Sequence, residues 1–159
     1  MTTEAQAKKQ EAKTFKKAGE LAAEHKFKWF EGSWPGHKKS KGHAADTTED
    51  LLHELAHYLV SPPGYRRHPN FGLGVPGSYK DEPGDIPIHL ANSLEEQASI
   101  LGIVMCREVG CTYSVCREIA RDHSWDFANE YPVRMEQLQE KGLWSTSRQR
   151  IWDRIYGSV

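Results

Sequence analysis

The sequence contains no run of about 18 apolar residues, so it predicts no membrane-spanning helix. Its first residues include Lys and Glu where a signal peptide needs an apolar stretch, and we therefore do not expect secretion through one. Cysteine is scarce, since only Cys106, Cys111 and Cys116 occur, at intervals of five residues. This spacing excludes a CxxC zinc pair, and the odd number excludes a fully paired disulfide framework. We expect reduced thiols and a cytoplasmic protein.

Arginine is absent from the first 45 residues, although the rest of the chain uses it more often than lysine. Residues 1–45 carry ten Lys and five Glu, whereas the remainder carries a net charge of −6. The sequence therefore predicts a Lys-rich N-terminal arm and linker, residues 1–45, followed by a helical domain, residues 46–159. The arm has few apolar residues before Phe27, so we expect residues 1–24 to be dispensable for folding. A solvated helix with a flexible linker explains the arm, and its charge also permits weak contact with nucleic acid or another anionic surface.

Residue propensities and capping residues predict a mostly α fold, or α+β at most with a small sheet. The expected helices cover residues 3–24, 46–60, 94–108, 113–129, 133–141 and 146–156. Residues 25–31 alternate loosely and predict one short strand. Residues 32–45 are predicted to be a linker, and residues 61–92, with six prolines and five glycines, a long loop.

One motif carries chemistry, the HExxH pattern His53-Glu54-Leu55-Ala56-His57 within the expected helix 46–60. Histidines at positions i and i+4 lie on one face of a helix, where both imidazoles reach one metal ion. Glu54 lies about 100° around the helix from His53, beside the ion, where a general base for an activated water belongs. The leucines of this helix fall on the opposite face, which can pack on the core, so the histidines can face a cleft. The motif predicts a metal site with His53 and His57 as ligands and Glu54 as catalytic base.

A third ligand must come from elsewhere in the chain. We favour Glu95, because it shares one face of its expected helix with a stripe of small residues that lets a second helix approach. The stripe consists of Ala98, Ser99, Gly102 and Cys106. Glu96 points away from this face and can form a capping box with Ser93. Glu96 and His68 remain alternatives for the third ligand.

The HExxH motif with a later glutamate resembles the zincins, a family of zinc hydrolases, and among them the gluzincin type. Metzincins place a histidine six residues after the second motif histidine, where this chain has Pro63. The resemblance implies a zincin-like fold in which the HExxH helix packs on a second, ligand-bearing helix. It implies a zinc metallopeptidase that acts on a peptide or protein, with Glu54 as base. A zinc ion closed by four protein ligands would instead stabilise a non-enzymatic binding module.

A second resemblance is to the elongation factor P hydroxylase family, and it covers roughly residues 50–108. It rests on three segments, His53-Glu54-Leu55-Ala56-His57-Tyr58, Arg66-Arg67 and Asn70-Phe71-Gly72. The family has Asp where this chain has Asn70. This resemblance implies an iron-dependent protein hydroxylase that modifies a lysine derivative, and two histidines with one carboxylate suit iron(II) as well as zinc. We expect Arg66, Arg67 and Phe71 to bind substrate.

Overall fold

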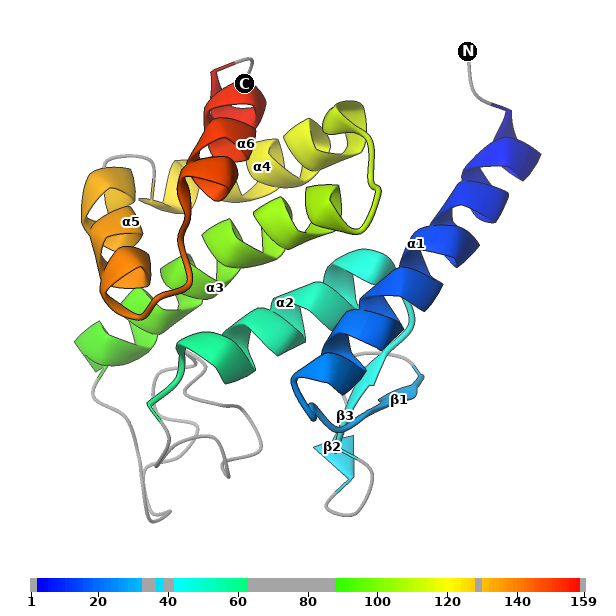
Figure 1. The fold of residues 1–159 in the computed structure, drawn as a ribbon, viewed down its shortest axis with the longest axis horizontal. Coiled ribbons are helices and arrows are strands. Elements are labelled where there is room, and N and C mark those ends of the chain that lie inside the picture. The colour runs from blue at the N-terminus through cyan, green and yellow to red at the C-terminus, as the bar shows by residue number, and fades with distance from the viewer. Residues whose placement is uncertain (1–2, 33–36, 39–41, 63–87, 128–129, 158–159) are drawn as a thin grey trace.

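The computed structural model describes residues 3–32, 37–38, 42–62, 88–127 and 130–157 (Figure 1). Within this part of the chain the fold is mostly helical with a small sheet, as the sequence predicts. The helices are α1 (Glu4–Glu24), α2 (Thr48–Val60), α3 (Ile88–Glu108), α4 (Tyr113–Phe127), α5 (Tyr131–Glu140) and α6 (Thr146–Tyr156). None of these helices is long and apolar enough to span a membrane.

Local sequence signals explain where some of the helices begin, but not where α3 begins. Side-chain hydroxyls cap the starts of α2 and α6, since those of Thr47 and Ser145 each accept a hydrogen bond from a backbone N–H of the first turn. α3 begins at Ile88, whereas the sequence predicted a start at Leu94. Ser93 therefore lies inside the helix, and the predicted capping box is wrong. No Gly or Pro occurs between Ile88 and Ser93, so nothing there interrupts the helix.

A three-stranded sheet lies beside α1 and α2. Its strands are β1 (Trp29–Glu31), β2 (His37–Lys38) and β3 (Gly42–Ala45). β3 is the central strand, parallel to β1 and antiparallel to β2, and it places Trp29 opposite His43. The strand predicted within residues 25–31 is confirmed, whereas the prediction of a linker is wrong for residues 37–38 and 42–45, which form β2 and β3. β3 contains small residues and shows no alternation of apolar and polar side chains, so the sequence did not predict a strand there. Pairing with β1 and β2 on its two sides stabilises the strand.

The hydrophobic core is built around α2 and α3, which lie side by side in Figure 1. α3 is central, because α2 covers one side of it and α4, α5 and α6 pack on the other (Figure 1). The fully buried side chains of the core include leucines of α2 and large aliphatic residues of α3. These are Leu51, Leu52, Leu55, Leu94, Ile100, Leu101 and Met105. Among the described elements, the two helices that carry the predicted metal ligands are therefore the most extensively packed pair.

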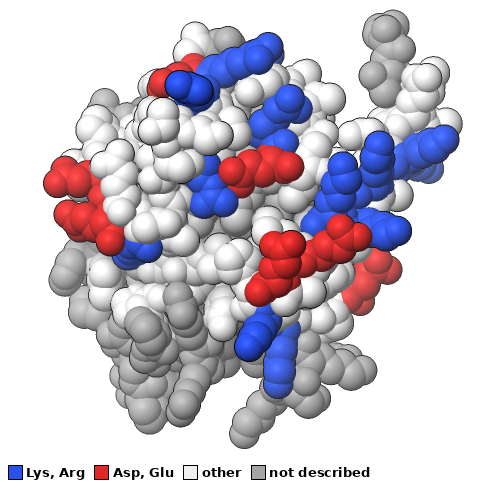
Figure 2. All heavy atoms as spheres, in the orientation of Figure 1, with Lys and Arg blue, Asp and Glu red and all other residues white. Residues whose placement is uncertain are grey.

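The Lys-rich helix α1 belongs to the same core. Ala18 and Ala22 are fully buried and Thr14 is nearly so, because one face of α1 packs against α2. The opposite face presents exposed lysines, and Figure 2 shows basic side chains gathered along the surface that α1 forms. Removing residues 1–24 would expose apolar surface of the core, so we now expect their deletion to destabilise the protein.

Glu11 joins α1 to the start of α2. Its carboxylate accepts hydrogen bonds from the backbone N–H of Thr48 at 2.7 Å and from the Thr48 hydroxyl at 2.8 Å. An acidic group here caps free N–H groups and interacts favourably with the helix dipole. We expect Glu11→Ala to lower the free energy of unfolding by about 1–2 kcal/mol, measured by urea denaturation. Glu20→Ala, at an exposed position of the same helix, is the control; equal losses in both variants would contradict this role.

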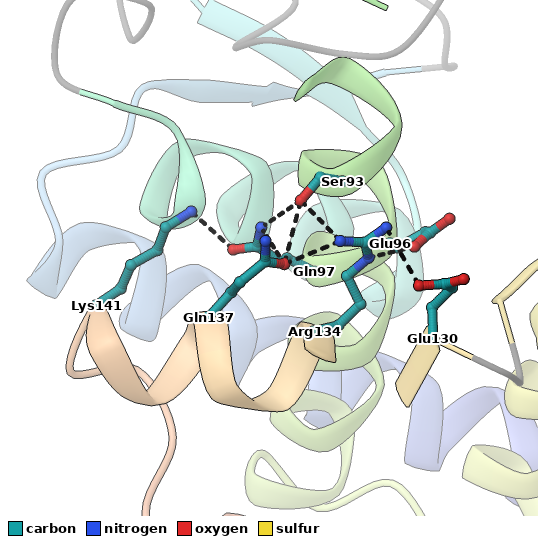
Figure 3. Close-up of polar contacts among 7 residues, drawn as sticks. All are labelled: Ser93, Glu96, Gln97, Glu130, Arg134, Gln137 and Lys141. Atoms are coloured by element: carbon teal, nitrogen blue, oxygen red, sulfur yellow. Dashed lines mark hydrogen bonds and ion pairs between the residues drawn. The ribbon is translucent and has the colours of Figure 1, made fainter. Parts of the chain in front are cut away.

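A polar network fastens α5 to α3 (Figure 3), and Lys141 extends it to the end of α2. Arg134 of α5 pairs with Glu96 of α3, and this ion pair replaces the predicted capping role of Glu96. At the other end of α5, the Lys141 ammonium donates to the amide oxygen of Gln97 at 2.7 Å and to the carbonyl of Val60 at 2.8 Å. The network joins the C-terminal end of α2 to α3 and so fixes how the two helices lie against each other.

Candidate metal centre

Three side chains converge where α2 lies against α3. Nε2 of His53 and Nε2 of His57 are 3.2 Å apart. The carboxylate of Glu95 reaches both rings, with Oε1 3.3 Å from His53 Nε2 and Oε2 2.6 Å from His57 Nε2. One candidate ligand atom from each residue lies within 4.8 Å of the other two, and among the described residues this trio is the only such group that could hold a metal ion.

The spacing of these atoms fits a small divalent ion. Zinc bonds to imidazole nitrogen are 2.0–2.1 Å long, so a tetrahedral site holds neighbouring ligand atoms about 3.3 Å apart. The separations of 3.2 and 3.3 Å match this value, and the 2.6 Å contact between His57 and Glu95 would open slightly to admit an ion. Two imidazoles and one carboxylate are ligands that both zinc and iron(II) accept.

Small residues of α3 bring Glu95 within reach of α2. Ala98 is fully buried and Ser99 nearly so, one turn after Glu95. Gly102 follows in the same stripe, and a Cβ atom there would lie 3.4 Å from the Cα of His53. The stripe inferred from the sequence is therefore the surface on which the HExxH helix packs.

Gly102 provides a test of this close packing. A methyl group at Gly102 would make ordinary van der Waals contact with α2, so we expect Gly102→Ala to keep the metal site. A leucine would place further atoms against the backbone of His53 and push the helices apart. We expect Gly102→Leu to weaken metal binding about tenfold or more, measured by competition with a chromogenic chelator. Equal metal affinity in both variants would contradict this account of the site.

The three candidate ligands perturb one another's protonation. Burial opposes the charged form of Glu95, but hydrogen bonds from His53 and His57 outweigh it and lower the carboxyl pKa far below its usual range. Burial lowers the pKa of His57, which is fully inaccessible to solvent. Burial also acts to lower the pKa of His53, but the bond to Glu95 and its negative charge raise it overall. An ionised carboxylate and a neutral His57 are the protonation states that metal ligation requires.

Glu54 points toward the sheet. Its Oε2 lies 3.2 Å from Nδ1 of His43 on β3, and both side chains are almost completely buried. Burial opposes ionisation of Glu54, but the bond to His43 and the nearby imidazoles of His57 and His53 lower its pKa overall. Glu54 is therefore a buried carboxylate beside the three candidate ligands, held by a residue from another element.

One edge of the cluster is open to solvent. The Glu95 side chain is 39% exposed and that of His53 25% exposed, whereas His57 is completely covered. His123 of α4 stacks on His53 with ring centroids 6.3 Å apart, and its Nε2 lies 3.8 Å from Glu49. The side of the cluster formed by Glu95 and His53 is therefore accessible to solvent, while His57 lies inside the protein.

The other predicted site residues are not found in the cluster of described residues. Glu96 faces Arg134 and does not belong to the cluster. Arg66, Arg67 and Phe71, the predicted substrate-binding residues, lie outside the described part of the chain, as does His68, the remaining alternative for the third ligand. Their predicted roles therefore stay predictions.

Two histidines near the cluster, His43 and His123, were missed by sequence reasoning. His43 is 4% exposed and stacks on Phe27, and its position depends on strand pairing that the sequence did not reveal. His123 reaches His53 from a helix 70 positions farther along the chain. Neither residue stands in a motif, so only the fold could show that they line the site.

Comparison with known proteins found no protein family, no curated protein and no solved structure that matches this chain.

Proposed function

We propose that the protein is a metal-dependent hydrolase that cleaves an amide bond of a peptide or protein. The observation that carries the proposal is the convergence of His53, His57 and Glu95 at a partly open edge of the α2–α3 pair. A zinc ion held by these side chains would act as a Lewis acid on the scissile carbonyl and make a water molecule acidic enough to lose a proton near neutral pH.

The surrounding residues have separate roles in this proposal. His53, His57 and Glu95 bind and orient the ion. Glu54 accepts the proton from the attacking water and passes it to the leaving amine, and its lowered pKa keeps it ionised for the first of these steps. His43 holds the Glu54 carboxylate in place from β3. Arg66, Arg67 and Phe71 are proposed to bind substrate.

The test is reconstitution of the chelator-treated full chain with Zn²⁺ or Fe²⁺, one metal at a time. Hydrolysis of a fluorogenic peptide library is measured for each form. We expect the zinc form to cleave peptides and the chelated form to be inactive. A zinc form that holds one ion per chain and cleaves no peptide in the library would overturn the proposal.

The same donor set supports a second candidate, an iron(II)-dependent protein hydroxylase. Two histidines and one carboxylate with open positions on one side form the facial triad of non-haem iron oxygenases. This candidate predicts that the iron form consumes oxygen when a lysine-containing protein substrate is supplied, while the zinc form does nothing.

A third candidate, a zinc-stabilised binding module, requires a fourth protein ligand, and the cluster of described residues supplies three.

We also propose that the exposed lysines of α1 make weak contact with nucleic acid. Lys9, Lys13 and Lys16 project from the face opposite the buried Thr14 and Ala18. If all three bind phosphates, replacing them by glutamine should reduce the slope of log affinity against log salt by about 3 for duplex DNA. The measurement is fluorescence anisotropy with a random-sequence oligonucleotide. Replacing the exposed Arg121 and Arg150 on other helices is the control, and equal effects would contradict the proposal.

A further inference from the structure

The C-terminus of α3 brings two cysteines together. The N–H of Cys111 donates to the carbonyl of Cys106 at 2.9 Å, and the N–H of Gly110 donates to the carbonyl of Arg107 at 3.1 Å. Gly110 has φ = +115°, which a residue with a side chain rarely adopts. This pair of bonds is a Schellman motif, in which the side chains of the first and last residues contact each other. This contact is frequently hydrophobic, whereas here both residues are cysteine.

The two thiols lie at the same turn and differ in character. A hydrogen bond from Cys106 lowers the pKa of Cys111, whereas the same bond, together with burial, raises the pKa of Cys106. Burial raises the pKa of the third cysteine, Cys116, to about 12. Cys111 is therefore the thiol that most readily becomes a nucleophilic thiolate.

Both cysteines of the pair line a cleft, where Cys111 is 7% exposed and Cys106 is 1% exposed. A cleft of about 240 Å³ between α1, α2, α3 and α4 is lined by both Cys106 and Cys111. Cys116 is fully buried and does not belong to the lining. The described residues that line the cleft include four acids and no lysine or arginine. The acids are Glu11, Glu49, Glu118 and Asp122.

We propose that Cys106 and Cys111 form a reversible thiol–disulfide site that reacts with cationic low-molecular-weight disulfides. The Cys111 thiolate attacks one sulfur of the small disulfide, and the first small thiolate leaves and takes up a proton. Cys106 then loses its proton and attacks Sγ of Cys111, which expels the second small thiolate. Two protein thiols are thereby oxidised to one disulfide, and the small disulfide is reduced by two electrons to two thiols.

The arrangement of the main chain favours closure of the protein disulfide. The 2.9 Å backbone bond joins the same two residues, and Arg107 holds the turn by donating to the carbonyl of Cys111 at 3.0 Å. A disulfide requires its two Cα atoms to lie close together, and the Schellman motif provides that proximity before oxidation. Excess small thiol reverses the reaction.

The test uses the folded full chain with three small disulfides of different charge. Cystamine is cationic, hydroxyethyl disulfide neutral and oxidised glutathione anionic. After reaction at neutral pH, the remaining thiols are alkylated in acid denaturant. Cleavage after Arg107 and Tyr113 then separates the three cysteines for mass spectrometry.

We expect the number of free thiols to fall from three to one, with a Cys106–Cys111 disulfide and alkylated Cys116. Cystamine should react about tenfold faster than oxidised glutathione at low salt, because the acidic lining attracts cations. Cys116→Ser should behave like the wild type, and Cys106→Ser should stop at a mixed disulfide on Cys111. A disulfide that includes Cys116, faster reaction with glutathione, or three unreacted thiols in the folded chain would each overturn the proposal.

Discussion

Replacing His57 by alanine is expected to lower metal binding by at least about 100-fold. The wild-type chain should hold about one ion, because a single cluster of three ligands occurs in its described part. His57 is completely buried, and its Nε2 lies within 3.2 Å of both His53 Nε2 and a Glu95 oxygen. Removing this ring leaves two ligands, which cannot enclose an ion. Metal content after dialysis, measured by elemental analysis, checks the prediction.

Because His57 is buried, its removal can also disturb the fold. His53→Ala removes a ligand that is 25% exposed and leaves a smaller cavity, so it separates loss of metal from loss of structure. We expect both variants to lose the ion, with a smaller change in melting temperature for His53→Ala. Full metal content in both variants would mean that the ion binds elsewhere.

Glu95 and Glu96 provide a matched pair for the same measurement. They are neighbours on α3, yet Glu95 contacts both histidines and Glu96 pairs with Arg134. We expect Glu95→Ala to lose metal as His53→Ala does. Glu96→Ala should keep the metal and lose about 1–3 kcal/mol of stability, since it leaves Arg134 without its ion-pair partner. The opposite pattern would contradict the geometry of the site.

The sequence alone predicts those parts of the site that depend on helical periodicity. His53 and His57 must share a face of α2, and the small residues Ala98 and Gly102 place Glu95 on the face of α3 that a second helix can approach. A helix fixes these relations within one or two turns. They could therefore be read without knowing how the rest of the chain folds.

The remaining features depend on contacts between distant segments. His43 is placed by β3, a strand of small residues that exists because β1 and β2 pair with it. The packed face of α1 consists mainly of alanines, so its burial could not be distinguished from the composition of a solvated helix. Glu96 appeared to be a cap because its partner, Arg134, lies 38 positions away. In each case the deciding interaction is tertiary, and local sequence carries no trace of it.

Glu54→Gln is expected to reduce hydrolysis by roughly 100-fold or more while the metal stays bound. Glu54 is 2% exposed, lies beside the candidate ligands and is not one of the three converging side chains. Glutamine has nearly the same shape and can still bond to His43, but it cannot accept a proton from water. The measurement is kcat on a peptide substrate of the zinc form, with metal content determined on the same sample.

The control for this variant acts on the partner of Glu54. His43→Asn leaves the carboxylate and its proton-accepting capacity in place but weakens the contact that orients it. A positioning role for His43 therefore predicts a smaller fall in kcat for His43→Asn than for Glu54→Gln, and no further fall when both changes are combined.

If Glu54→Gln releases the metal, Glu54 is a ligand; if it keeps both metal and activity, the base is another group. Retained metal with lost activity is the result that the position of Glu54, buried beside the ligands and outside their cluster, leads us to expect.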